Sequence, residues 1–339
     1  MAVTLQLVNY VKVTGNYCYR RALHQNVARF HSSRRNLVAQ IIDGRAIAQT
    51  IKDEVKAQVE KIVSSAGRRP HLCVILVGDD PASAVYVKNK IESANYTGIS
   101  SDNIKLPNNS TQKEVVDIIK ALNTNADVDG ILVQLPIAGH MDERTICNTV
   151  VPHKDVDGFH VLNAGRFMVD QKAFMPATPA GVMEIIRRVG IKTRGQNAVV
   201  CGRSKNVGLP IAMLLHADGN HDSNAGGDAT TTICHRNTPH DQLRRLTETA
   251  DLIVSATGVR NLITGDMVKE GVAVIDVGIT RIVDPKSGKA RLVGDVDFES
   301  VAEKASFITP VPGGVGPVTV AMLLQNTLKA YKREIDFYV

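Results

Sequence analysis

The chain lacks tryptophan altogether, contains few other aromatic residues and has no long hydrophobic run. No apolar stretch approaches the roughly 18 residues that a membrane-spanning helix requires, so no membrane partner is expected. Hydrophobic residues form 44% of the sequence and charged residues 22%, proportions typical of a globular enzyme and not of a disordered or fibrous chain. The length of 339 residues is sufficient for about two domains.

Cysteine is also scarce, and its spacing excludes two kinds of site. The five cysteines contain no C-x-x-C pair, and one of them, Cys18, lies near the N-terminus. Such scattered positions indicate neither a disulfide framework nor a zinc site. We predict reduced, mostly buried thiols in an intracellular compartment.

Acidic residues are absent from residues 1–42, which contain six basic ones. Without these six, 34 basic and 34 acidic residues remain from Asp43 onward, so the body of the chain is neutral by formal count. No nucleic-acid partner is therefore expected, despite a net charge of +6 and a pI near 9.0. An acid-free, arginine-bearing N-terminus predicts a mitochondrial transit peptide over residues 1–35, with a disordered basic arm as the alternative.

Short apolar segments alternate with helical patterns along the rest of the chain, which predicts parallel sheets. We expect an α/β protein of two domains, each a largely parallel sheet flanked by helices, the second a Rossmann-like dinucleotide-binding domain. The first domain is expected over 36–180, completed by a C-terminal helix over 315–335, and the second over 181–312. The expected strands cover residues 72–78, 103–106, 128–136, 231–234, 251–258 and 272–278, and a strand, turn and helix follow one another within 197–215.

The segment CGRSKNVG is the candidate nucleotide site. Gly202 and Gly208 do not satisfy G-x-G-x-x-G, but Gly202 permits a sharp strand exit and Ser204 offers a hydroxyl beside a helix N-terminus. A tight structural turn is the alternative.

Positive charge occupies the place where an NAD enzyme carries an acid. The second strand of the unit ends in His235-Arg236, and Arg203 in the glycine turn can add a second positive charge. Two arginines near a ribose indicate a phosphate, either part of the cofactor or free.

Three further features are candidates for substrate chemistry. In SAVYVKNK, Tyr86 and Lys90 share one helical face, although such spacing also occurs by chance in ordinary helices. Gln134 and Asp157 follow expected strand ends, where turn residues are the alternative. The loop PVPGGVGPVT at 310–319 leaves bare backbone that a flat ligand could approach, with a structural hinge as the alternative.

Together these segments resemble one family. SAVYVKNK, VDGILVQLP, KDVDGF, PATPAG, GRSKNVGLP, SATG, VIDVGI and PVPGGVGPVT, in this order, are similar to methylenetetrahydrofolate dehydrogenase/cyclohydrolase, over about residues 40 to 333. The HADGNHDSNAGGDAT stretch and the His-Arg pair resemble the mitochondrial, NAD-dependent bifunctional members. The resemblance implies a homodimer that oxidises 5,10-methylenetetrahydrofolate with NAD and then hydrolyses the product to 10-formyltetrahydrofolate.

The resemblance also implies the roles of individual residues. Lys90 is the chemical residue with Gln134 beside it, Tyr86 stacks on the folate rings, and Asp157 binds the amino edge of the pterin. The folate site implied by the resemblance further includes Asn89, Val133, Leu135, Pro312, Gly313, Gly314, Val315 and Gly316. The cofactor site implied comprises Gly202, Arg203, Ser204, Gly208 and Arg236.

One carboxylate near the arginines predicts a metal. Asp228 in GGDAT precedes the strand that ends at His235, and a carboxylate beside Arg203 and Arg236 could hold Mg²⁺ together with inorganic phosphate. A phosphate held there would occupy the place of a 2′-phosphate, so that NAD is accepted, with NADP as the other possible cofactor. A plain turn residue is the alternative for Asp228.

Three other functions compete with this interpretation. A short-chain dehydrogenase also uses Tyr-x-x-x-Lys, but there the glycine-rich turn precedes the pair, whereas here it follows. A silent folate- or nucleotide-binding regulator would have no need of Lys90. A monofunctional, NADP-dependent methylenetetrahydrofolate dehydrogenase stays open, because some relatives lack the hydrolysis.

Overall fold

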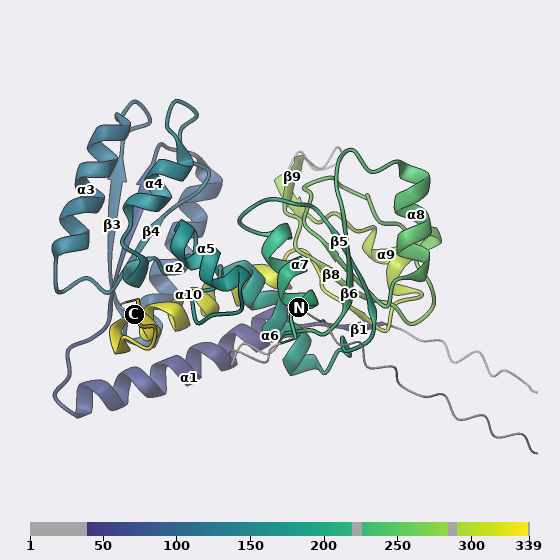
Figure 1. Cartoon of the computed structure of the whole chain (residues 1–339), viewed down its shortest axis with the longest axis horizontal. Helices are drawn as coiled ribbons and strands as arrows, with labels where there is room; N and C mark the ends of the chain where they lie inside the picture. Colours follow the sequence, from purple (N-terminus) through teal and green to yellow (C-terminus); the bar gives the residue numbers. More distant parts are fainter. Residues whose placement is uncertain (1–38, 219–225, 284–289, 338–339) are drawn as a thin grey trace, which may run out of the picture. The chain divides into compact units, whose positions relative to one another are not determined.

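The computed structural model describes residues 39–218, 226–283 and 290–337 (Figure 1). The expected transit peptide over residues 1–35 lies outside the described residues, as does part of the HADGNHDSNAGGDAT stretch. Among the described helices, none combines the length and hydrophobicity needed to cross a bilayer.

The first sheet has three parallel strands in the order β3-β2-β4, with bounds β2 (His71–Val77), β3 (Ser100–Leu106) and β4 (Gly130–Val133). Residues 72–77 of β2 are all buried, because helices cover both faces of the sheet. Leu72, Val74 and Leu76 face the core formed with α1 (Gly44–Ser64) and α10 (Val315–Lys332). The alternate residues Cys73, Ile75 and Val77 pack with α3 (Gln112–Thr124) and α4 (Glu143–Thr149).

Local signals set the helix that follows β2. Helix α2 (Pro81–Thr97) begins with Pro81 at its first position, and the Asp80 side chain accepts a hydrogen bond from Ser83 N at 2.8 Å. The helix ends at Gly98, whose φ of 79° is in the left-handed region that favours glycine. Tyr86 and Lys90 therefore lie one turn apart in a helix that begins at the carboxyl end of a buried strand.

The second sheet has six parallel strands in the order β1-β11-β8-β7-β5-β6. Its central strands are β5 (Asn197–Cys201), β6 (Thr230–Cys234), β7 (Leu252–Ser255) and β8 (Ala273–Asp276), with β1 (Gln40–Ile41) and β11 (Phe307–Ile308) at one edge. The helices α7 (Gly208–His216), α8 (His240–Thr249) and α9 (Phe298–Ala302) accompany it. The chain passes from β5 to β6 on one side and to β7 on the other, so β5 is the point where the strand order reverses, which is the ligand-binding position of doubly wound sheets.

Several elements were not expected from the sequence. Strands β1 and β11 contain two residues each, too few for any periodicity, and β9 (Thr280–Val283) and β10 (Ala290–Val293) form a separate antiparallel pair. Residues 40–41, expected in the first domain, pair instead with β11 of the second sheet. Helix α5 (Val161–Met168) and the short helices η1 (Pro152–Lys154) and η2 (Gly265–Met267) were also not anticipated.

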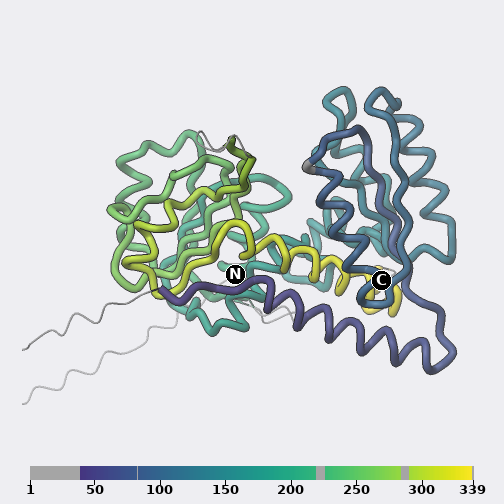
Figure 2. Tube along the Cα trace, turned by 180° about the vertical axis from the view of Figure 1, so that it is seen from behind, coloured from purple at the N-terminus to yellow at the C-terminus, as the bar shows by residue number. Residues whose placement is uncertain are grey.

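The C-terminal helix returns to the first part of the chain. Helix α10 packs against α1, α2 and α6 (Ala177–Val189) and also contacts β2 and β4. Both backbone views show α10, in yellow, running beside α1, in purple (Figures 1 and 2). The Pro/Gly loop that precedes α10 is thereby held next to the start of α1, where a Cβ on Gly44 would lie only 1.8 Å from Gly314 O.

Candidate active site

Lys90 and Gln134 meet at the carboxyl end of the first sheet. Gln134 follows β4 directly, and its main-chain N–H donates to Ile75 O at 2.8 Å, which continues the strand pairing. Lys90 Nζ donates to Gln134 Oε1 at 3.0 Å, while Gln134 Nε2 donates to Leu135 O at 2.7 Å. Because the amide nitrogen is committed to Leu135, the amide oxygen faces the lysine and supplies an acceptor without a negative charge.

The electrostatics of Lys90 favour a proton-transfer role. Burial lowers the pKa of Lys90, and the negative charge of Asp157 opposes that shift without cancelling it. Burial also raises the pKa of Asp157 to about 6, although Lys90 pulls it down. Lys90 and Asp157 therefore shift each other's pKa. The neutral form of Lys90 appears at a lower pH than that of a lysine fully exposed to water.

A second carboxylate fixes the loop that carries Asp157. Asp155 is buried, and its side chain accepts hydrogen bonds from His160 N at 2.8 Å and Asn163 Nδ2 at 2.8 Å. Gly158 has a φ of 70°, and a Cβ there would lie 2.4 Å from Phe174 O, so the turn requires glycine. The two aspartates of KDVDGF thus differ: Asp155 stabilises the turn, and Asp157 acts on Lys90. The sequence analysis did not assign a role to Asp155, although two aspartates separated by one residue in a turn were a usable signal.

Tyr86 and Asn89 line a cavity of about 780 Å³. Pro312 to Gly316, from the loop before α10, line it as well, so the structure brings the predicted tyrosine, asparagine and Pro/Gly loop together. Lys90, Gln134 and Asp157 are not part of this lining, but Lys90 lies one helical turn from Tyr86. Val133 and Leu135 lie on either side of Gln134, Val133 buried and Leu135 half-buried.

The cavity also contains charged residues that the sequence analysis did not assign. Arg45 and Lys52 reach it from α1, and Asp276 reaches it from the end of β8. Asp276 is buried and accepts hydrogen bonds from Gly278 N at 3.0 Å and Val296 N at 2.9 Å. Burial raises the pKa of Asp276 to about 6. The position of Asp276 at the carboxyl end of an apolar segment was the same signal that singled out Gln134.

The glycine turn after β5 is as tight as the sequence indicates. Gly202 has a φ of 116°, and a Cβ there would lie 2.3 Å from Ala256 O. A Cβ on Gly208 would lie 2.3 Å from Gly202 O, and Gly208 N donates to Ser204 Oγ at 3.2 Å. Both glycines are therefore required sterically, and the Ser204 hydroxyl serves the turn that starts α7.

Arg203 and Arg236 lie at the carboxyl end of the second sheet. Cys201 of β5 pairs with Cys234 of β6, and Arg203 and Arg236 each follow two residues after a member of this pair. Both side chains are exposed. The register thus brings them to the same end of adjacent strands, beside the glycine turn.

The structure does not bring Asp228 to these arginines. Asp228 precedes β6 (Thr230–Cys234), whereas Arg236 follows it, so the length of the strand lies between them. The Asp228 carboxylate lies 3.5 Å from Arg194 Nε instead, and Asp228 O accepts from Gly195 N at 2.9 Å. Parallel strands bring together residues at the same end of a sheet. Asp228 lies at the amino end of β6, whereas Arg203 and Arg236 follow the carboxyl ends of β5 and β6, so the three do not fit a magnesium–phosphate site.

Comparison with known proteins identifies the family of the chain. The family model for the tetrahydrofolate dehydrogenase/cyclohydrolase catalytic domain matches residues 42–157, and the one for the NAD(P)-binding domain of the same enzymes matches residues 176–335. The chain belongs to the tetrahydrofolate dehydrogenase/cyclohydrolase family. The resemblance inferred from the motifs is thereby confirmed.

The relatives cover nearly the whole chain. The mitochondrial bifunctional methylenetetrahydrofolate dehydrogenase/cyclohydrolase of Gallus gallus is 57% identical over 321 residues, which are 93% of this chain and 95% of the relative. The mitochondrial bifunctional methylenetetrahydrofolate dehydrogenase/cyclohydrolase 2 of Homo sapiens is 58% identical over 306 residues, 90% of this chain and 88% of the relative.

A solved structure supports the fold. The structure of a 5,10-methylenetetrahydrofolate dehydrogenase from the silkworm, Bombyx mori, superposes with a TM-score of 0.82 at 49% identity and covers 87% of this chain and 99% of that one. The predicted α/β fold with a Rossmann-like NAD(P)-binding part is confirmed.

Proposed function

We propose that this chain is a bifunctional one-carbon folate enzyme. It oxidises 5,10-methylenetetrahydrofolate to 5,10-methenyltetrahydrofolate with NAD⁺ and hydrolyses that product to 10-formyltetrahydrofolate. The observation that carries the proposal is the half-buried Lys90, bonded to the uncharged Gln134 at 3.0 Å, within a chain of this family. The names of relatives that are 57–58% identical support both activities.

The oxidation requires position more than acid–base chemistry. When bound, NAD(P) accepts a hydride from the one-carbon unit of the folate. The lone pairs of N5 and N10 stabilise the resulting cation, so no strong base is needed at this step. Tyr86 stacks on the folate and Asp157 bonds the amino edge of its pterin, and together they fix the reacting carbon in place.

The hydrolysis requires a base. Water attacks the methenyl carbon and gives a proton to neutral Lys90, which leaves a hydroxyl on that carbon. The hydroxyl then loses its proton as the formyl C=O forms, the bond from the carbon to N5 breaks, and N5 takes up a proton. The net products are 10-formyltetrahydrofolate and one proton. The burial that lowers the pKa of Lys90 makes the neutral form available, and a cationic substrate would lower it further. Gln134 orients the lysine and leaves its charge uncompensated.

Arg203 and Arg236 hold a phosphate group in this proposal. An inorganic phosphate between them lets the enzyme use NAD⁺, and the 2′-phosphate of NADP⁺ competes for the same two arginines. Magnesium has no part in the proposal, because Asp228 lies at the other end of β6. The first domain is proposed over 42–180 with 315–335 and the second over 181–312, to whose sheet β1 (Gln40–Ile41) adds by pairing with β11.

The proposed location is the mitochondrion, and the proposed assembly is a homodimer. The acid-free residues 1–42 and the mitochondrial names of relatives support the location. Fusing residues 1–42 to a fluorescent reporter tests it, and a diffuse cytosolic signal would refute it. Light scattering on the purified chain tests the assembly, where a monomer mass would refute the dimer.

Two separate assays test the bifunctional proposal. Purified enzyme with methylenetetrahydrofolate and NAD⁺ should form the methenyl compound, and enzyme with pure methenyltetrahydrofolate and no nucleotide should accelerate its hydrolysis above the buffer rate. Oxidation without accelerated hydrolysis would leave the monofunctional dehydrogenase. Absence of both activities in a folded sample would overturn the proposal.

A further inference from the structure

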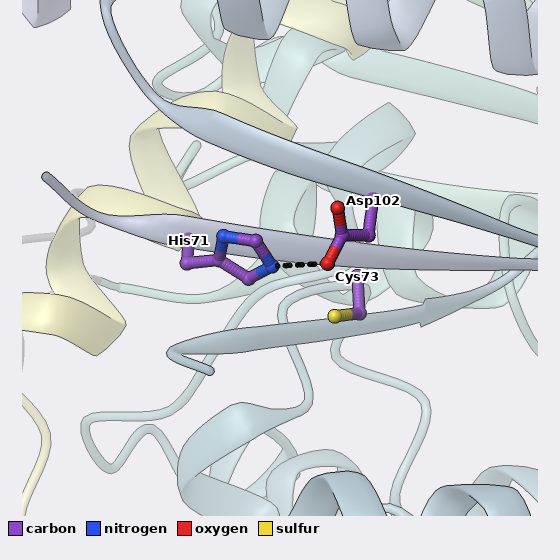
Figure 3. A group of neighbouring side chains, drawn as sticks. All are labelled: His71, Cys73 and Asp102. Atoms are coloured by element: carbon purple, nitrogen blue, oxygen red, sulfur yellow. Dashed lines mark hydrogen bonds and ion pairs between the residues drawn. The ribbon is translucent and has the colours of Figure 1, made fainter. Parts of the chain in front are cut away.

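Three different metal-ligating side chains meet at the amino end of the first sheet. His71 and Cys73 are two residues apart in β2 and therefore lie on the same face, and Asp102 of β3 is the register partner of Cys73. One ligand atom from each of the three lies within 4.8 Å of the others, and Figure 3 shows the imidazole, the carboxylate and the thiol gathered together. Sequence spacing could not reveal this group, because its members come from two strands joined by a helix.

The hydrogen bonds of His71 leave one nitrogen facing an acceptor. His71 Nδ1 lies 2.8 Å from Ser100 Oγ, and the Ser100 hydroxyl also lies 3.0 Å from Pro70 O. His71 Nε2 lies 3.1 Å from Asp102 Oδ2. In the tautomer that carries its proton on Nδ1, the Nε2 lone pair faces the carboxylate, an arrangement that suits a bound cation.

We propose that His71 Nε2, Cys73 Sγ and Asp102 Oδ bind a zinc-type divalent cation, with water as fourth ligand. Nitrogen, thiolate and carboxylate are the ligand types of Zn²⁺, and in a tetrahedral site their atoms lie about 3.4–3.6 Å apart. The separation of 3.1 Å between His71 Nε2 and Asp102 Oδ2 is already this short, and the longer separations in the group, up to 4.8 Å, have to decrease by as much as about 1.2 Å to reach this geometry. Ser100 supplies the outer contact that a metal-bound histidine commonly has, since it accepts the proton of the other ring nitrogen.

The thiol is the group most changed by the metal. A bound divalent cation deprotonates a coordinating thiol, and the released proton goes to solvent. The 70% exposed side chain of Asp102 leaves the site open to an arriving ion, while Cys73 is 1% exposed.

The site lies apart from the catalytic residues in this proposal. Its strand β2 is anchored beside it, because Asp129 accepts from His71 N at 2.8 Å and from both terminal nitrogens of Arg68 at 2.7 Å. His71 begins β2, whereas Gln134, which Lys90 contacts, follows β4 beside Ile75 of β2, about 15 Å further along the sheet. Metal binding should therefore stabilise the fold without changing either activity.

Cobalt titration of the chelator-treated full chain tests the proposal. We expect one equivalent of Co²⁺ to bind with a near-ultraviolet thiolate-to-cobalt band, and Zn²⁺ to displace it and raise the melting temperature. The band should disappear in Cys73→Ser and persist in the matched control Cys147→Ser, which changes a buried cysteine of α4. Ser100→Ala should lower the affinity about 10- to 100-fold, and Asp102→Asn should lower it more.

Two results would overturn the site. One is a wild-type protein that shows no thiolate band and no Zn²⁺-dependent melting shift. The other is a band of equal intensity in Cys73→Ser. Since Asp102 is exposed, Asp102→Asn should fold normally, and unchanged zinc affinity in that folded variant would equally refute the proposed ligand set.

Discussion

The two sheets of this enzyme both place functional side chains at the carboxyl ends of parallel strands, but they surround these side chains differently. In the first sheet, Lys90 is half-buried against Gln134, and its pKa is shifted by burial. In the second sheet, Arg203 and Arg236 are exposed beside a sterically rigid glycine turn. In the proposed function, proton transfer therefore uses a desolvated group, whereas phosphate recognition uses solvated charges next to preorganised backbone.

The largest effect is expected from removing the desolvated base. Lys90→Ala should reduce cyclohydrolase activity by about 10²- to 10⁴-fold, the usual contribution of a general acid or base. Folate binding should be largely retained, because Tyr86, Asn89 and the Pro/Gly loop still line the cavity. Hydrolysis of pure methenyltetrahydrofolate measures the effect, with Lys88→Ala, an exposed lysine of the same helix, as the matched control. Unchanged hydrolysis in Lys90→Ala would remove Lys90 from the mechanism.

A smaller effect is expected from Asp157→Ala. Losing a charge-assisted hydrogen bond to the pterin should cost about 1.5–3 kcal/mol, or roughly 10- to 150-fold in folate affinity. Titration of the folate in a binding assay measures this directly. Affinity equal to that of the wild type would contradict the pterin contact.

Asp157 also predicts a pH dependence. Its folded pKa of about 6 lies above the ordinary value of 3.8, so its contribution to stability is fully present below about pH 3.8 and is lost as the pH rises through 6. Asp157→Asn should therefore gain stability relative to wild type at pH 8 and not at pH 4.

Asp157→Asn also removes a charge that raises the pKa of Lys90, so the acid limb of the pH profile of hydrolysis should move to lower pH. A limb that moves to higher pH would contradict this coupling.

The rigid turn of the second sheet gives a contrasting prediction. Gly202→Ala should destabilise the protein by about 1–3 kcal/mol, because the new Cβ would meet Ala256 O at 2.3 Å. NAD-linked oxidation should fall more than hydrolysis, which uses the other sheet. Gly165→Ala is the control, since its Cβ would meet nothing within 4 Å. Thermal melts and both activity assays compare the two variants. An equal loss of stability and of NAD-linked oxidation in Gly165→Ala would contradict the special requirement for glycine at 202.

The smallest effect concerns the phosphate. Arg236→Ala should abolish the dependence of NAD-linked oxidation on inorganic phosphate while leaving hydrolysis unchanged, because Arg236 follows β6 of the second sheet and Lys90 contacts the first. Asp228→Ala should leave the phosphate dependence as it is, since Asp228 contacts Arg194 at the opposite end of β6. Initial rates against phosphate concentration distinguish the two. A phosphate response lost in Asp228→Ala would restore a role for that carboxylate.

The sequence by itself determined the class of fold and the family. The apolar run 72–77 and the alternation of such runs with helical patterns predict parallel sheets, because a strand buried on both faces must be hydrophobic at every position. Lys90 and Gln134 were predicted as neighbours from the resemblance of their motifs to one family, and their 3.0 Å contact agrees. The sharp turn at Gly202 was also predicted from the sequence, and its φ of 116° is one that few other residues tolerate.

Only the tertiary structure decided which end of a strand each polar residue occupies and what lies across from it. Asp228 is close to Arg236 in sequence but lies beyond the opposite end of β6, because an extended strand carries the chain about 3.3 Å per residue. Conversely, Asp102 is far from His71 in sequence, yet the β2–β3 register brings their side chains to 3.1 Å. Spacing along the chain reports helical and strand faces within one element, whereas the pairing of elements depends on packing contacts that no local pattern encodes.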